Sequence, residues 1–198
     1  MAKVVKFPIP TPEKFGPERV RKKKETGTEK PGQLNLFTGG KVIRLNKLTD
    51  FEEALFIDER GESKEAKKLY LKAIEQGDSL ADAYCNLGII EWQEGNQSKA
   101  VDYFTLGLKN YPRHFEAHYN LANLYSELGN FPLATAHYKI SIELEPAFSN
   151  SYFNLALTHA INREFAEAVN LLKQYRELTT ADDQKQTDEL IQKLLGAI

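Results

Sequence analysis

Residues 83–88 of this chain read Ala-Tyr-Cys-Asn-Leu-Gly, and the pattern returns as Ala-His-Tyr-Asn-Leu-Ala at 117–122 and Ser-Tyr-Phe-Asn-Leu-Ala at 151–156. Each step along the chain is 34 residues. A fixed period of this length is typical of a solenoid, in which each unit buries its apolar face against the next unit. Counting from Ala81 predicts the repeats 81–114, 115–148 and 149–182, and projecting backwards predicts a further repeat at 47–80.

The spacing of small and large residues, which recurs in each unit, predicts two packed helices joined by a turn. Small side chains at two positions let the helices approach closely, and a large side chain at a third position fills the gap between them. The twentieth position of the unit is always alanine, and the twenty-fourth is large: Ala66, Ala100, Ala134 and Ala168, with Tyr70, Phe104, Tyr138 and Leu172. Glycine marks the turn at Gly61, Gly95 and Gly129, where a positive φ is expected.

This pattern resembles the tetratricopeptide repeat family over residues 47–182. The resemblance implies an all-α, right-handed superhelical solenoid of helix-turn-helix repeats. The outer repeats depart from the family pattern, for example at Arg163 in place of the turn glycine, which is common in terminal repeats. Residues 180–198 predict a C-terminal capping helix, because Leu190, Ile191, Leu194 and Leu195 fall on one face that can cover the last repeat.

The N-terminal segment differs in composition from the repeats. Residues 1–46 hold 11 Lys and Arg against 4 Asp and Glu, whereas residues 47–198 hold 15 against 24. Five of the eight prolines also lie within 1–46. High net charge with few apolar residues does not build a core, so we predict a basic, Pro- and Gly-rich and largely disordered tail. Charge asymmetry of this kind is typical of an interaction arm.

In the resembled family the first helices of successive repeats line a concave groove. Carried over residue by residue, the resemblance implies that Asn86, Asn120 and Asn154 form a ladder of side-chain amides in this groove. An amide donates and accepts at once, so the ladder suits the backbone of an extended peptide, with apolar pockets beside it. The other residues implied for the groove are Trp92, Tyr119, Phe153, Ile89, Asn123 and Leu157.

Several of these residues have an alternative role within the fold itself. The asparagines can hydrogen-bond inside their own helix pair, and Tyr119 and Phe153 can pack between repeats. Trp92 follows Glu91, which stands where the family has an aromatic core residue, so Trp92 can also turn inward in its place. The sequence leaves both interpretations open.

The charges near this surface indicate the chemistry of a partner. Some tetratricopeptide proteins hold the carboxylates of a chaperone tail with Lys and Arg, but this chain has neither at the matching positions within 48–157. Acidic residues gather instead toward the N-terminal end: Glu52, Asp58, Glu59, Asp82, Glu94 and Glu116. We therefore predict a partner protein that presents an extended, neutral or basic segment.

Catalysis, cofactor binding and metal binding are not indicated. Cys85 is the only cysteine, which excludes a disulfide framework and a cysteine-based metal site. His114 and His118 have the spacing of a helical chelate, but one falls in a predicted turn and the other at a core position. Because no arrangement of side chains suggests a catalytic site, we predict that the protein is not an enzyme. The chain has neither an apolar run long enough to cross a membrane nor a secretory signal, so we predict a cytoplasmic protein.

A short apolar segment stands out in the tail. Gln33, Leu34, Leu36 and Phe37 match all four specified positions of the bacterial sliding-clamp-binding pentapeptide, which this segment resembles. The resemblance implies a sliding clamp as a partner. Two alternatives are a small hairpin with residues 41–45, and an apolar peptide that folds back into the protein's own groove. The basic cluster at 19–24 suits weak, non-specific contact with nucleic acid, or else is a solvated linker.

These observations favour a protein-interaction adaptor that binds an extended peptide in the groove of its repeats. The alternative is an accessory factor in DNA replication or another DNA-associated process, recruited through the clamp-like segment or the basic tail. Self-association through the groove or the C-terminal helix is a third hypothesis. The sequence holds no arrangement of side chains from which to argue a catalytic site.

Overall fold

The computed structural model of this chain describes Val20 and residues 48–196. Within those residues every regular element is an α-helix, which confirms the predicted all-α class. The helices are α2 (Asp50–Glu59), α3 (Ser63–Glu75), α4 (Leu80–Gln93), α5 (Gln97–Asn110), α6 (Phe115–Glu127), α7 (Phe131–Leu144), α8 (Ser149–Ile161), α9 (Phe165–Glu177) and α10 (Ala181–Leu195).

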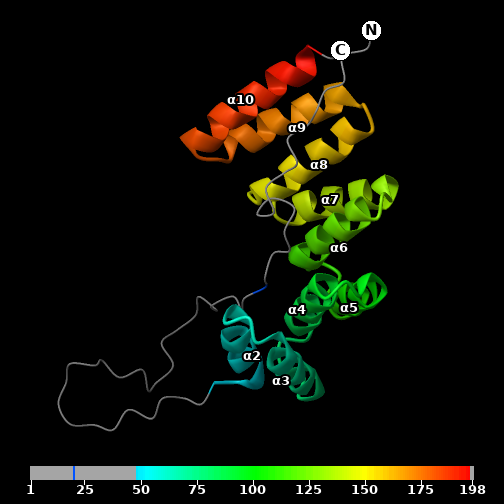
Figure 1. Ribbon diagram of the computed structural model, residues 1–198, viewed down its shortest axis with the longest axis vertical. Coiled ribbons are helices and arrows are strands. Elements are labelled where there is room, and N and C mark those ends of the chain that lie inside the picture. The colour runs from blue at the N-terminus through cyan, green and yellow to red at the C-terminus, as the bar shows by residue number, and fades with distance from the viewer. Residues whose placement is uncertain (1–19, 21–47, 197–198) are drawn as a thin grey trace, which may run out of the picture.

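The helices stack in antiparallel pairs along one axis, from α2 and α3 at one end to α9 and α10 at the other (Figure 1). Each first helix packs most closely on the second helix of its own pair, and each second helix contacts the first helix of the next pair. The predicted solenoid of helix pairs is therefore confirmed. One pair falls within each of the four predicted 34-residue windows, to within one residue at the start of α4.

The turns between paired helices follow the prediction made for their glycines. Gly61, Gly95 and Gly129 adopt φ angles of 79°, 81° and 74°, in the left-handed region where a side chain costs energy. Arg163 occupies the same place in the last pair with φ of 64°. The last pair therefore has the same turn conformation, although an arginine takes the place of glycine.

Small side chains let the paired helices approach closely. A Cβ added to Gly88 in α4 would lie 2.7 Å from the ring of Phe104 in α5, which is closer than real contacts allow. Phe104 is fully buried in the gap between these helices, as are its counterparts Tyr70 and Tyr138. The alternation of small and large residues read from the sequence therefore describes real interdigitation in the core.

The last helix, α10, covers the end of the solenoid. Leu190, Ile191 and Leu194 are buried in one apolar cluster with residues of α8 and α9, such as Leu172. Leu195 was expected on the same face, and this expectation is wrong: 47% of its surface is exposed. Leu195 is the last residue of α10 and lies outside the cluster that buries Leu190, Ile191 and Leu194.

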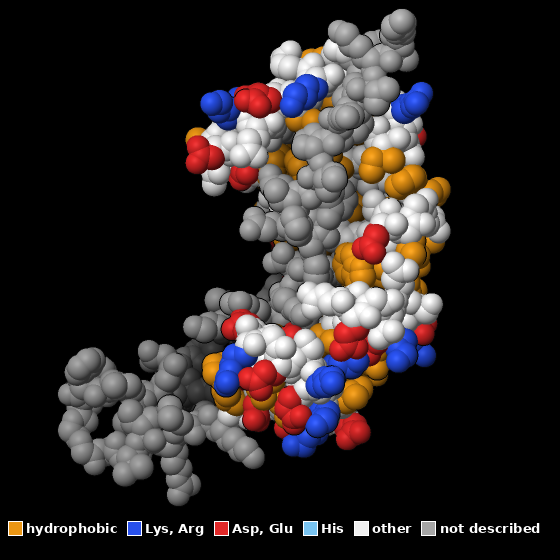
Figure 2. All heavy atoms as spheres, in the orientation of Figure 1, with side chains coloured by type: hydrophobic (Ala, Val, Ile, Leu, Met, Phe, Trp, Pro, Cys, Tyr) orange, Lys and Arg blue, Asp and Glu red, His pale blue; other side chains and the backbone are white. Residues whose placement is uncertain are grey.

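Figure 2 shows charged side chains of both signs crowded over the end formed by α2 and α3. None of the helices in the described part of the chain is both long and apolar enough to cross a membrane. The clamp-like segment 33–37 and most of the tail lie outside the described residues, so the predictions made for them stay predictions. Val20 is described, and its place decides the candidate site.

Candidate peptide-binding site

The first helices of successive pairs, α4, α6 and α8, contact one another along the stack and bring the three ladder asparagines into one row. Asn86, Asn120 and Asn154 occupy equivalent places on these helices, and all three side chains are fully buried. A buried amide must satisfy both its donor and its acceptor group within the protein, so the partners of each asparagine define what the row does.

Asn86 holds the backbone of Val20, 66 residues earlier in the chain. The Val20 N–H donates to Asn86 Oδ1 at 3.0 Å, and Asn86 Nδ2 donates to the Val20 carbonyl oxygen at 2.9 Å. The N–H and C=O of a single residue point the same way in an extended strand, so one amide side chain can pair with both. Both bonds go to main-chain atoms, so Asn86 recognises the backbone of the bound residue and not its side chain.

The Val20 side chain lies in an apolar site next to this amide. Val20 is only 3% exposed, and it belongs to the same buried cluster as Cys85, Ile89 and Leu121. These residues come from α4 and α6, so the site lies where two repeats meet. A β-branched aliphatic side chain gains about 1.5–3 kcal/mol from such burial.

The other two ladder asparagines contact side chains of the preceding repeat. Asn120 Nδ2 lies 3.5 Å from Cys85 Sγ on the preceding repeat. Asn154 Nδ2 donates to Tyr119 Oη at 3.1 Å and to Asn123 Oδ1 at 2.9 Å. These contacts join repeats to one another, and the structure places only Asn86 against a described segment from outside the helices.

The aromatic groove candidates also take part in packing. Tyr119 is fully buried, with its ring centroid 4.9 Å from that of Phe148. Phe153 is half-buried, 5.0 Å from the ring of Tyr175, and Leu157 joins the cluster under α10. Tyr119 thus packs on the residue that precedes α8, and Phe153 packs on α9 of its own helix pair.

Trp92 has not replaced the core residue before it. Glu91 is itself buried, 2% exposed, with Lys67 Nζ 2.5 Å from its carboxylate and Asn96 Nδ2 donating at 2.8 Å. Burial would raise the pKa of Glu91, but the hydrogen bonds from Lys67 and Asn96 outweigh it and the pKa is lowered. Trp92 stays half-buried at the edge of the Val20 cluster, where its Nε1 donates to Glu127 at 2.8 Å.

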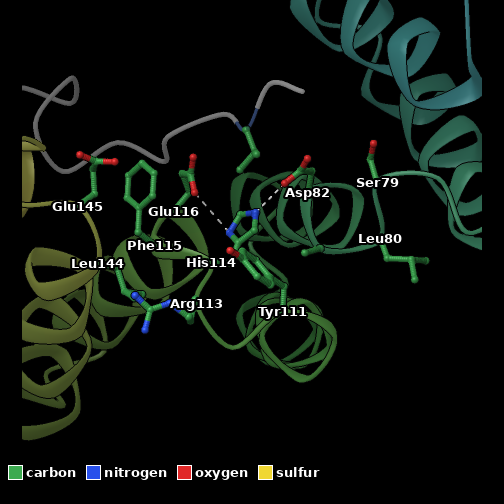
Figure 3. Close-up of a pocket in the computed structure, with 12 residues that line it drawn as sticks. Ser79, Leu80, Asp82, Tyr111, Arg113, His114, Phe115, Glu116, Leu144 and Glu145 are labelled. Atoms are coloured by element: carbon green, nitrogen blue, oxygen red, sulfur yellow. Dashed lines mark hydrogen bonds and ion pairs between the residues drawn. The ribbon is translucent and has the colours of Figure 1, made fainter. Parts of the chain in front are cut away.

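A pocket of about 470 Å³ borders Val20 between the start of α4, the turn that leads into α6 and the end of α7. Three carboxylates line it, those of Asp82, Glu116 and Glu145, together with the single cation Arg113 among its described lining residues. Figure 3 shows the three carboxylates turned to the same side of the pocket. The space next to Val20 is therefore acidic and suits a basic side chain.

His114 fixes one wall of this pocket. Its Nδ1 accepts the amide of Ala117 at 3.0 Å, capping α6, and its Nε2 lies 2.7 Å from Asp82 Oδ1. Because Nδ1 is an acceptor, the ring proton is on Nε2 and is donated to Asp82. Figure 3 shows both interactions of the ring with the neighbouring acids, Asp82 and Glu116.

His118, the other histidine of the suggested chelate, faces a different way. Its Nδ1 lies 2.9 Å from Nδ1 of His137 in α7, and its Nε2 lies 3.1 Å from the carbonyl oxygen of Pro112. The described residues hold no group of three or more metal-ligating side chains. The two histidines thus serve separate structural contacts.

Sequence reasoning missed Val20. The tail 1–46 was predicted to be largely disordered, and within it both the backbone and the side chain of Val20 are held by the repeats. The apolar segment proposed to fold back was 33–37, and the residue found in the groove is a valine within the basic cluster. The sequence feature that could have pointed to this contact is an aliphatic residue, Val20, between Arg19 and Arg21.

Comparison with known proteins agrees with the repeat architecture. Two family models described as tetratricopeptide repeat match, one over residues 58–115 and the other over 115–148. No curated protein matches the sequence.

Solved structures share the fold at low identity. The TPR2B domain of yeast Sti1 in complex with pHsp70 is 24% identical, with a TM-score of 0.55, covering 60% of this chain and 98% of that one. YrrB, a TPR protein with an unusual peptide-binding site, is 16% identical with a TM-score of 0.59, covering 71% and 73%. The first TPR of RPAP3 bound to an HSP90 peptide is 19% identical with a TM-score of 0.53, covering 59% and 94%. This chain therefore contains tetratricopeptide repeats, and residues 58–148 are the part that the family models match.

Proposed function

We propose that this chain is a non-catalytic protein-interaction module, which binds an extended segment of a partner protein in the groove of its repeats. The observation that carries the proposal is the pair of hydrogen bonds between Asn86 and the backbone of Val20. A fully buried amide that exchanges two bonds with a chain segment recognises backbone, as peptide-binding grooves do. Repeat proteins whose solved structures contain Hsp70 or Hsp90 segments have a similar fold.

The preferred segment is neutral or basic. The pocket beside the amide carries Asp82, Glu116 and Glu145. A peptide that ends in several carboxylates would meet like charge there, so the acidic chaperone tails are unsuitable ligands for this groove. Asn86 is the anchor of the proposed site, and Trp92, whose side chain is half-buried beside the same cluster, is the second candidate contact.

Selection of peptides from a random library displayed on phage tests this function. Because Val20 holds the same amide, the test is made in full chains that carry Val20→Asp. We expect selected peptides to be neutral or basic and to bind such a chain less tightly, by tenfold or more, after Asn86→Ala, because the ligand backbone loses two buried hydrogen bonds. The matched control is Asn110→Ala on the exposed face of α5, where affinity should not change. Circular dichroism verifies that all variants remain helical. Equal affinity with and without a folded Asn86→Ala change in this background would contradict the proposal.

Recruitment to a sliding clamp through Gln33, Leu34, Leu36 and Phe37 stays a separate prediction. These residues lie outside the described part of the chain. Deletion of residues 33–37 with a clamp-binding assay tests it independently of the groove.

A further inference from the structure

The residue that Asn86 holds belongs to this same chain, and its sequence context matches the chemistry of the site. Val20 is preceded by Arg19 and followed by Arg21, Lys22, Lys23 and Lys24. We propose that the Arg-Val-Arg segment 19–21 is a ligand built into the protein, which occupies the groove at Asn86 until a partner segment of similar chemistry displaces it. This rests on the proposed function, since it names the resting occupant of the same groove.

Backbone recognition is the first part of the argument. Asn86 uses both functional groups of its amide on Val20, at 3.0 Å and 2.9 Å. A partner segment cannot form the same two bonds while Val20 holds them. Occupation by the chain's own segment and occupation by a partner are therefore mutually exclusive.

Side-chain recognition is the second part. The Val20 side chain shares a buried cluster with Cys85, Ile89 and Leu121, which leaves 3% of its surface exposed. An aliphatic side chain suits this apolar cluster, whereas a charged side chain would be buried there without a partner. The site thus requires an aliphatic residue at the place held by Asn86.

Charge is the third part. Val20 borders the pocket lined by Asp82, Glu116 and Glu145, and the sequence places an arginine on each side of it. Carboxylates next to the aliphatic site favour a ligand in which basic residues flank the aliphatic one. Residues 19–21 have this order of side chains, which distinguishes them from the other valines of the tail, such as Val4 and Val42.

Chain length makes an intramolecular ligand effective. Residues 21–47, which are 27 residues, connect Val20 to the described repeats. A tether of this kind gives an effective concentration of about 1 mM. If the chain's own segment has an intrinsic dissociation constant of about 100 µM for the groove, a partner segment would bind the unmodified chain about tenfold more weakly than a chain whose own segment cannot compete.

The experiment uses a fluorescent synthetic peptide of residues 13–27 and three full-length proteins: wild type, Val20→Asp and the matched control Val42→Asp. We expect Val20→Asp to bind the peptide about tenfold more tightly than the other two, measured by fluorescence anisotropy. Equal binding by all three proteins would overturn the proposal, as would failure of this peptide to bind any of them.

Modified peptides test the contacts without altering the fold. N-methylation at Val20 removes the donated proton, and we expect about a tenfold loss of affinity for the Val20→Asp protein. A peptide with Arg19→Glu and Arg21→Glu should bind more weakly still at low salt. If both modified peptides bind as tightly as the original, the groove does not read this segment.

The failures of the two proposals are distinguishable. If phage-selected peptides bind in an Asn86-dependent way but the 13–27 peptide does not, the groove binds peptides and the built-in ligand is wrong. Light scattering identifies the remaining occupant, a second copy of the chain. A dimer in wild type that becomes a monomer in Val20→Asp would show that Val20 is exchanged between copies, which overturns the intramolecular form.

Discussion

Lys67 of α3 places its Nζ 2.5 Å from the carboxylate of Glu91, a buried acid in α4, and so joins the first two helix pairs. Glu91 is 2% exposed and also accepts a hydrogen bond from Asn96, at the start of α5. The hydrogen bond to Glu91 raises the pKa of Lys67, so the pair is ionised at neutral pH. A charge in the core is tolerated here because two donors from neighbouring helices satisfy it.

Removal of the cation from this pair should destabilise the fold. We expect Lys67→Met to lower the free energy of unfolding by about 2 kcal/mol, since it leaves a buried carboxylate without its counter-ion while Asn96 remains. Urea denaturation followed by circular dichroism measures the change. The matched control, Lys68→Met, removes an exposed lysine paired with Glu65 and should change stability by less than about 0.5 kcal/mol.

The double variant Lys67→Met with Glu91→Leu completes the cycle. An apolar pair in place of a buried ion pair is often neutral or stabilising, so stability should return to within about 1 kcal/mol of wild type. A double variant as unstable as the sum of two damaging changes would contradict this account of the pair.

Gly88 should not tolerate a methyl group. We expect Gly88→Ala to lower the free energy of unfolding by about 1–2 kcal/mol, because a Cβ would lie 2.7 Å from the buried ring of Phe104 and the gain in helix propensity is smaller. Gly196→Ala is the control, since its Cβ would lie at an ordinary 3.6 Å from the nearest atom. Thermal unfolding of the two variants makes the comparison, and an unchanged or higher midpoint for Gly88→Ala would refute it.

Arg163 offers a stabilising substitution. Its φ of 64° is the conformation that Gly61, Gly95 and Gly129 adopt in the other turns. We expect Arg163→Gly to raise the free energy of unfolding by about 0.5–1 kcal/mol, because glycine takes this conformation without the steric cost. The reverse change in the neighbouring repeat, Gly129→Arg, should lower it by a similar amount. In denaturant titrations the two changes in the free energy of unfolding should have opposite signs. Changes of the same sign would contradict the conformational argument.

The histidine pair between α6 and α7 should make stability depend on pH. Burial, and then the neighbouring His118, lowers the pKa of His137 to about 4, and burial also lowers the pKa of His118. Both rings are held neutral in the folded protein, whereas in the unfolded chain they take up protons near pH 6.5. The stability that comes from keeping both rings neutral is therefore fully present above about pH 6.5 and is lost as the pH falls toward 4.

We expect the free energy of unfolding to fall by about 1–2 kcal/mol between pH 7 and pH 4.5 from this pair, less than a fully buried ring would give because His137 is partly exposed. His137→Gln keeps a polar partner for His118 and should flatten this part of the profile. Denaturant titrations across the pH range measure both proteins. The same slope in each would show that the pair does not cause the dependence.

Much of the fold could be predicted because the repeat makes local information redundant. Gly61, Gly95 and Gly129 specify one turn three times over, and the alternation of Ala100 with Phe104 returns in each unit. The helix pairs follow from this spacing without knowledge of distant contacts. The burial prediction was wrong at a helix end: Leu195, the last residue of α10, is 47% exposed.

The candidate site was only partly predictable. The sequence marked Asn86, Asn120 and Asn154 as equivalent, and all three are buried in a row along the first helices. Their partners differ, because Asn154 meets Asn123 and Tyr119 of its neighbour whereas Asn86 meets Val20. Asn120 and Asn154 each place Nδ2 against the side chain of the residue 35 positions earlier, Cys85 and Tyr119 respectively, so this part of the row repeats, whereas the contact of Asn86 with Val20 comes from outside the repeats.

The sequence by itself determined the helical repeat, its turns and the row of asparagines, since each depends on side-chain size and spacing over a few tens of residues. Only the tertiary structure decided which segment meets Asn86. The contact joins residues 66 positions apart and uses the N–H and C=O of Val20. Those groups are present at nearly every residue of the chain, so they do not distinguish Val20 in the sequence. The apolar cluster and the acidic pocket that favour Val20 and its basic neighbours exist only once α4 and α6 have packed together.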